Sequence, residues 1–140
     1  MYKKILIAYD GSEPSKTALK AAIELAKLAG AELHSLSVEE HLPHYASTVT
    51  EVLESKRERN SLFKELIEEA KQLALEQGVT LNANVLPGHA VETIIHYAER
   101  GNFDLIVVGR ATHSRIFKKL LGRTANQIIL HAPCSVLVVK

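Results

Sequence analysis

Cysteine is almost absent from this chain of 140 residues, in which Cys134 is the only one. A single thiol excludes an internal disulfide and is typical of a reducing compartment. Long apolar runs are absent as well. The amino-terminal segment has two lysines and then five apolar residues, 5–9, too few for the core of a secretory signal. No segment approaches the length of a transmembrane helix. We therefore expect a cytoplasmic protein with no membrane partner.

The sequence also lacks an excess of charge of either sign. Seventeen Lys and Arg stand against sixteen Asp and Glu, which leaves a net charge of +1. Such a balance gives no overall attraction to nucleic acid, so we expect no nucleic-acid partner and only local electrostatic steering. A hydrophobic content of 46% with 24% charged residues is typical of one ordinary globular domain, predicted to span residues 1–140.

Short β-rich segments alternate with helical ones along the chain. The first and fourth strands are nearly continuous apolar runs, as in strands buried on both faces, whereas the third alternates apolar and polar residues and is predicted to be peripheral. The predicted strands span 3–9, 32–38, 80–86, 104–109 and 135–140. The predicted helices span 14–29, 48–77, 89–100 and a segment from near Gly122 to before Ala132.

This alternation predicts an α/β fold: an open five-stranded parallel sheet with helices on both faces, Rossmann-like. Ligands of such sheets bind beyond the carboxyl ends of the strands. The segment HLPHYAST (41–48) is the one long irregular connection and a candidate flap. The sequence has no metal-ligand spacing and no nucleophile-elbow context, so we predict no metal site and no hydrolase triad.

Asp10 follows the first strand and has two interpretations. A carboxylate at this position can accept hydrogen bonds from ribose hydroxyls. Asp-Gly-Ser before Pro14 is also a good turn and helix start, with Ser12 as the N-cap. Spacing alone leaves both interpretations open.

The segment GRATHSRIFKKLLGRTAN (109–126) follows the fourth strand. Its glycines, Gly109 and Gly122, lie thirteen residues apart with five basic residues between them, counting His113, and the segment has no acidic residue. Glycines allow close backbone approach to a phosphate, and the start of the fourth helix would offer free N–H groups. Neither GxGxxG nor GxxxxGK[ST] is present. On the residues alone, the segment is either a phosphate loop or a solvated basic loop.

The whole chain resembles the universal stress proteins. The resemblance rests on YKKILIAYDGSEPS at the start, GHAVETI at 88–94, DLIVVG at 104–109 and HAPCSVLVVK at the end. It implies the strand order 3-2-1-4-5 and a homodimer that pairs the last strands, 135–140, across a two-fold axis. It also implies an adenine nucleotide, ATP, ADP or AMP, as the ligand, with Mg²⁺ able to accompany ATP although no second carboxylate is evident to hold it.

The family's ATP-binding branch has the pattern G-x2-G-x9-G-[ST] after the fourth strand. This chain keeps its spacing but has Thr112 in place of the second glycine and Arg123 in place of Ser or Thr, with Thr124 one position late. By resemblance, Asp10 takes the ribose position, and Ala8 and Val38 line the adenine through their backbones. The nucleotide-binding residues implied are Ala8, Tyr9, Asp10, Val38, Gly88, Val108, Gly109, Arg110, Thr112, Gly122, Arg123, Thr124 and Ala125.

Two functions from different classes follow. The first is a regulatory dimer that binds an adenine nucleotide, with slow or absent turnover because no general base is evident. The second is a nucleotide-free interaction module that acts through an unidentified protein partner. An ATP pyrophosphatase-like enzyme is disfavoured, because DGSEPS matches the SGGxDS loop of that class poorly.

Overall fold

The computed structural model describes residues 1–40, 49–110 and 118–140, with backbone alone for 49–55 and 118–123. The predicted flap, 41–48, lies outside the described residues. The elements follow one another as β1 (Lys4–Ala8), α1 (Glu13–Ala29), β2 (Glu32–Glu39), α2 (Val49–Glu76), β3 (Leu81–Pro87), α3 (Ala90–Arg100), β4 (Leu105–Gly109), α4 (Lys118–His131) and β5 (Ser135–Val139). Within this described part, no helix has the length and apolarity needed to cross a membrane.

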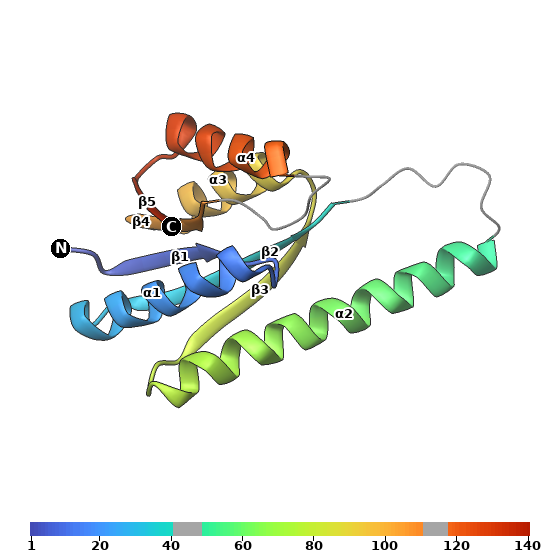
Figure 1. Cartoon of the computed structure of the whole chain (residues 1–140), viewed down its shortest axis with the longest axis horizontal. Helices are drawn as coiled ribbons and strands as arrows, with labels where there is room; N and C mark the ends of the chain where they lie inside the picture. The colour runs from blue at the N-terminus through green and yellow to red at the C-terminus, as the bar shows by residue number, and fades with distance from the viewer. Residues whose placement is uncertain (41–48, 111–117) are drawn as a thin grey trace.

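The strands form one parallel sheet in the order β3-β2-β1-β4-β5, which confirms the predicted fold class (Figure 1). β1 lies between β2 and β4, and Ile5 is in register with both Leu33 and Leu105. β3 is an edge strand, as its alternating pattern predicts. The order reverses between β1 and β4, so the carboxyl ends of these two strands form the switch point where open sheets bind ligands.

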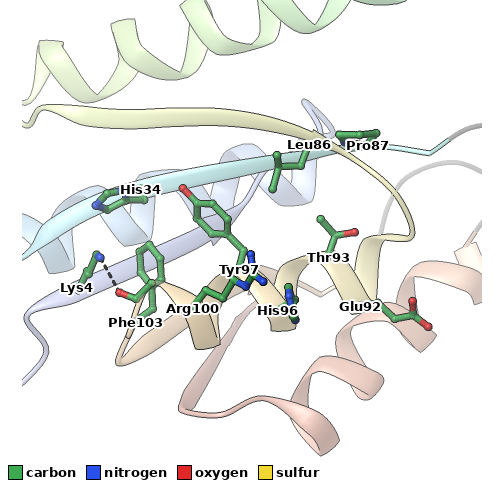
Figure 2. Close-up of a pocket in the computed structure, with 11 residues that line it drawn as sticks. Lys4, His34, Leu86, Pro87, Glu92, Thr93, His96, Tyr97, Arg100 and Phe103 are labelled. Carbon is green, nitrogen blue, oxygen red and sulfur yellow. Dashed lines mark hydrogen bonds between the residues drawn. The ribbon is translucent and has the colours of Figure 1, made fainter.

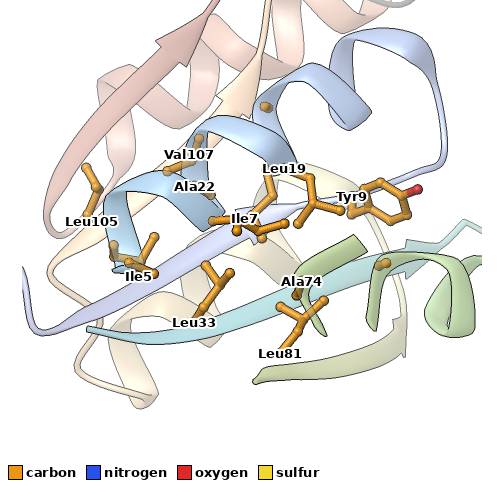
Figure 3. Packing of buried hydrophobic residues seen from close by; sticks show 14 residues of the cluster. Ile5, Ile7, Tyr9, Leu19, Ala22, Leu33, Ala74, Leu81, Leu105 and Val107 are labelled. Atoms are coloured by element: carbon orange, nitrogen blue, oxygen red, sulfur yellow. The ribbon is translucent and has the colours of Figure 1, made fainter. Parts of the chain in front are cut away.

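Helices cover both faces of the sheet (Figure 1). On one face, α1 and α2 pack over the α1–α2 core, which includes Ile5, Ile7, Tyr9, Leu19, Ala22, Leu33, Ala74, Leu81 and Val107 (Figure 3). On the other face lies the α3–α4 core, which includes Leu6, Leu36, Ile94, Ala98, Phe103, Ile106, Val108, Ala125 and Ile128. Alternate residues of β1 enter opposite cores because side chains along a strand point alternately to its two faces.

Helix ends match the sequence signals at α1. The Ser12 side chain accepts a hydrogen bond from the Ser15 backbone N–H at 3.3 Å, which confirms Ser12 as the N-cap. Gly30 ends the helix in the left-handed conformation, φ 65°.

The predicted start of α4 is wrong. The helix begins at Lys118 and not near Gly122, which lies inside it. Lys and Leu at 118–121 are good helix formers, and a single glycine costs a helix only about 1 kcal/mol, so Gly122 does not mark a boundary.

Candidate functional site

The carboxyl ends of the central strands gather several of the predicted residues. Ala8 ends β1 and Gly109 ends β4, and Val108 is buried just before it. The register pairs Ile7 with Val107, which brings Ala8 and Val108 to the same level. Ala8 and Val38 are half-buried and pack on the α3–α4 core. The two positions implied for adenine thus lie on one face of the sheet, beside the switch point.

Asp10 forms the turn that links β1 to α1. Its Oδ1 accepts a hydrogen bond from the Ser12 N–H at 2.9 Å, which is an Asx turn. The structural interpretation of Asp10 is therefore correct. The residue is also exposed at the carboxyl edge of the sheet, and the turn hydrogen bond engages one of its two oxygens. A role in binding ribose is compatible with this geometry.

Tyr9 lies between Ala8 and Asp10, but its side chain points to the opposite face from Ala8. The ring is buried in the α1–α2 core, 2% exposed, at one end of the cluster (Figure 3). Its hydroxyl is buried and has no hydrogen-bond partner among the described residues. Burial raises the Tyr9 pKa to about 12, and the charges of Glu69, Asp10 and Glu13 add to the shift. The side chain of Tyr9 therefore lies away from the adenine positions.

Gly109 has a packing role of its own. A Cβ built on it would lie 2.6 Å from the Pro14 carbonyl oxygen and 2.7 Å from its carbon. The first turn of α1 thus packs directly on the end of β4, where no other residue fits without movement. The next residue, Arg110, is exposed and donates its backbone N–H to Val139 at 3.0 Å.

Gly88 links β3 to α3 with a positive φ of 138° and donates its N–H to the Glu39 carbonyl at 3.1 Å. Beside it, Glu40 Oε1 accepts the Ala90 N–H at 3.0 Å, at the amino end of α3. No role for Glu40 was predicted from the sequence. The acidic residue satisfies a free N–H and the positive helix end, so this terminus holds a carboxylate of the chain itself.

The amino end of α4 differs from those of α1 and α3. Glu13 stands in the first turn of α1, and Glu92 in that of α3, whereas the first turn of α4 has no acidic residue and begins with Lys118 and Lys119. Because a helix that connects parallel strands runs back along them, this end lies at the carboxyl side of the sheet. Two cations at a positive helix end make an anion favourable there.

The remaining predicted residues lie in four different settings. Thr112 lies outside the described residues. Gly122 and Arg123 are within α4, with backbone alone described. Ala125 is buried in the α3–α4 core. Thr124 is half-buried and lines a cavity of about 590 Å³ between α3 and α4, together with Glu40, His89 and His131 among others. The described residues hold no cluster of His, Cys, Asp or Glu suited to a metal ion.

Comparison with known proteins identifies the family of this chain. Residues 1–140 match the Universal stress protein family. Over an alignment of 151 residues that covers the whole of both chains, it is 34% identical to YxiE, a universal stress protein of Bacillus subtilis. The chain belongs to the universal stress protein family. The predicted family resemblance is thereby confirmed.

Solved structures of universal stress proteins share this fold. UspA from Lactobacillus plantarum superposes with a TM-score of 0.85 at 25% identity, covering 99% of this chain and 98% of that one. An Arabidopsis thaliana family member with AMP bound has a TM-score of 0.69 at 21% identity, covering 99% and 91%. Complexes with cAMP and with dAMP, the latter from Archaeoglobus fulgidus, have TM-scores of 0.75 and 0.66 at 23% and 22% identity and cover 99% of this chain.

Proposed function

We propose that this universal stress protein is a regulatory protein that binds an adenine nucleotide at the carboxyl ends of β1 and β4. The observation that carries the proposal is that the exposed carboxylate of Asp10 lies at the same edge of the sheet as a helix end that begins with two lysines and has no acidic residue in its first turn. Family members of the same fold hold AMP, cAMP or dAMP, which supports the choice of ligand.

Each part of the nucleotide has a partner of matching chemistry. Asp10 accepts hydrogen bonds from the ribose hydroxyls, while the backbones at Ala8 and Val38 line the adenine. Gly109, Arg110 and the amino end of α4 face the phosphates. We also assign the flanking residues Tyr9, Gly88 and Val108, and residues 112 and 122–125, to this site.

The departures from the family pattern change the phosphate contacts without removing them. Loss of a hydroxyl bond to a charged phosphate weakens binding by about 1.5–3 kcal/mol, roughly ten- to a hundredfold. Arg123 supplies a guanidinium in place of that hydroxyl, and a guanidinium pairs with phosphate through two parallel bonds. We therefore propose that ATP or AMP binds through a modified phosphate loop.

We propose little or no turnover at this site. No general base stands out next to Asp10, and the described residues offer no carboxylate cluster to hold Mg²⁺. Mg²⁺ then binds as a companion of the ATP phosphates and not in a site of the protein's own.

The test is calorimetric titration with ATP and with AMP, each with and without Mg²⁺. Asp10→Asn keeps an oxygen for the Ser12 turn but removes the charge, so we expect about tenfold weaker binding of both nucleotides. Arg123→Ser should change the affinity for ATP more than that for AMP, because ATP carries more phosphate. Glu24→Gln, an exposed change on α1, is the matched control and should bind as the wild type does.

The alternative function is a nucleotide-free interaction module. This alternative is supported if the wild type shows no binding heat and no shift in melting temperature at millimolar nucleotide. A bound nucleotide should shift the melting temperature, because a ligand at a hundred times its Kd stabilises the folded protein by about 2.7 kcal/mol. Restored binding in Thr112→Gly with Arg123→Ser would then show that the phosphate loop has lapsed.

A further inference from the structure

A second concave surface lies away from the proposed nucleotide site. This groove, of about 710 Å³, runs between α3 and the β2–β3 side of the sheet (Figure 2). Its volume is in the range of small-molecule sites. None of the residues assigned above to the nucleotide lines it. The lining residues are Lys4, His34, Leu86, Pro87, Glu92, Thr93, His96, Tyr97, Arg100, Gly101 and Phe103.

One end of the groove is cationic. Lys4, His34 and Arg100 gather there around Phe103, as Figure 2 shows. The Lys4 Nζ donates to the Gly101 carbonyl at 2.6 Å and lies 4.6 Å from the centre of the Phe103 ring. Within the described part of the chain, no carboxylate forms an ion pair with Lys4 or Arg100. The charges of Lys4 and Arg100 are thus uncompensated by an ion pair, whereas His34 has the Glu32 carboxylate at 3.7 Å.

His34 adds an unused polar atom at the same end. Its Nε2 is buried and has no hydrogen-bond partner among the described residues, and the nearest carboxylate oxygen, on Glu32, is 3.7 Å away. Burial lowers the pKa of His34, and the Lys4 charge lowers it further. Buried polar atoms in proteins are normally satisfied, so a ligand group that hydrogen-bonds this nitrogen removes a deficit.

The middle of the groove is aromatic, and its far end combines apolar residues of β3 with the polar side chains of Thr93 and His96. Tyr97 stacks on Phe103 with ring centres 5.6 Å apart, and the ring of His34 meets Phe103 edge-on at 5.0 Å. Beyond Tyr97, Leu86 and Pro87 of β3 form the far end (Figure 2). Leu86 is a large apolar side chain left 36% exposed. Glu92 lies at this end and discourages a second negative group on the ligand.

We propose that the groove binds an amphipathic monocarboxylate. Its carboxylate lies at the Lys4–His34–Arg100 end, and its apolar body extends past Tyr97 to Leu86. The charge at one end and the apolar surface at the other match a single ligand with one anionic group and an acyl or aryl chain. The site is separate from the nucleotide site and requires no nucleotide.

The experiment is titration of nucleotide-free protein with sodium octanoate and, as a neutral match of the same chain length, 1-octanol, followed by methyl and imidazole NMR. We expect octanoate to bind at least tenfold more tightly than 1-octanol and to shift the Leu86 methyl and His34 ring signals. Arg100→Gln, at an exposed position, should weaken octanoate about tenfold and leave 1-octanol unchanged. This corresponds to the loss of one charge-assisted contact.

Arg57→Gln is the control, because Arg57 is exposed on α2, over the opposite face of the sheet. It should leave both affinities unchanged. Lys4→Gln should act like Arg100→Gln, but Lys4 also bonds Gly101, so Arg100→Gln decides the question if Lys4→Gln impairs folding. Equal affinity for octanoate and 1-octanol would overturn the proposal. The proposal would also be overturned if Arg100→Gln left the affinity for octanoate unchanged, or if octanoate did not shift the NMR signals of the Leu86 methyls and the His34 ring.

Discussion

Neighbouring residues at the end of β1 have unlike surroundings. Ala8 packs on the α3–α4 core, Tyr9 is buried in the α1–α2 core, and Asp10 is exposed. The Tyr9 hydroxyl has no partner among the described residues, and a buried unsatisfied hydroxyl costs about 1–3 kcal/mol. The Tyr9 hydroxyl therefore lowers the stability of the fold next to the proposed nucleotide site.

Tyr9→Phe removes that hydroxyl and should raise the free energy of unfolding at pH 7 by about 1 kcal/mol. The folded-state pKa of about 12 exceeds the ordinary value of 10.0. Ionisation of Tyr9 therefore leaves the free energy of unfolding of the wild type unchanged below pH 10. It lowers that free energy as the pH rises from 10 toward 12, because the unfolded chain loses the proton first. Urea unfolding at pH 7 and pH 10.5 checks both effects, and the alkaline decline should be smaller in Tyr9→Phe. A less stable variant at pH 7 would show that the hydroxyl has a partner in solution.

At the level of elements, the two glycines of the 109–122 spacing have different physical roles. Gly109 permits α1 to touch the end of β4 at Pro14, which is a packing requirement with or without a ligand. Gly122 lies inside α4, where glycine lowers helix stability by about 1 kcal/mol relative to alanine. A glycine retained at that cost is consistent with close approach of a phosphate.

The corresponding alanine variants should change stability in opposite directions. Gly109→Ala forces the Pro14 backbone to move and should lower the free energy of unfolding by about 1–3 kcal/mol. Gly122→Ala should raise it by about 1 kcal/mol while weakening ATP binding. Denaturant unfolding and calorimetry on the same preparations measure both quantities. Gly109→Ala with wild-type stability, or Gly122→Ala with wild-type affinity for ATP, would contradict the respective role.

At the scale of the whole molecule, β5 is an edge strand with an apolar sequence. Leu137 is 37% exposed there. An uncovered apolar edge invites pairing with another chain. We accordingly propose a homodimer through residues 135–140, in which each copy covers the edge of the other.

Leu137→Glu should convert this dimer to a monomer, because two-fold symmetry brings like charges together at the interface. Sedimentation velocity over a range of protein concentrations measures the change. Leu28→Glu is the control, since Leu28 on α1 is 87% exposed and far from β5 in sequence. A wild type that sediments as a monomer at all concentrations would exclude the β5 dimer.

Much of this architecture is readable in the sequence. Apolar runs identified β1 and β4 as central strands, alternation identified β3 as an edge, and Ser12 identified the start of α1. These signals are local, and each depends on a few adjacent residues. The strand order came from the family resemblance, since periodicity does not state which strands are neighbours.

The features of the fold and of the candidate sites that could not be predicted from the sequence depend on contacts between distant segments. Glu40 caps α3 from fifty residues away in the sequence. Gly109 is needed because the Pro14 backbone, nearly a hundred residues earlier in the sequence, packs against it. The start of α4 was misplaced because a glycine inside a helix looks like a boundary. The groove between α3 and the sheet collects residues from β1, β2, β3 and α3, and no single stretch of sequence contains its pattern.

The register of β1 has a consequence for biosynthesis. Ile5 pairs with Leu33 on one side and with Leu105 on the other. A ribosome that adds roughly 5–20 residues per second makes the second partner on the order of 5–20 s after β1. During that interval a strand that is central and buried in the folded protein has an uncovered edge. The nascent chain thus has a period in which it depends on dilution or on chaperones. The proposed nucleotide site is incomplete until β4 leaves the ribosome.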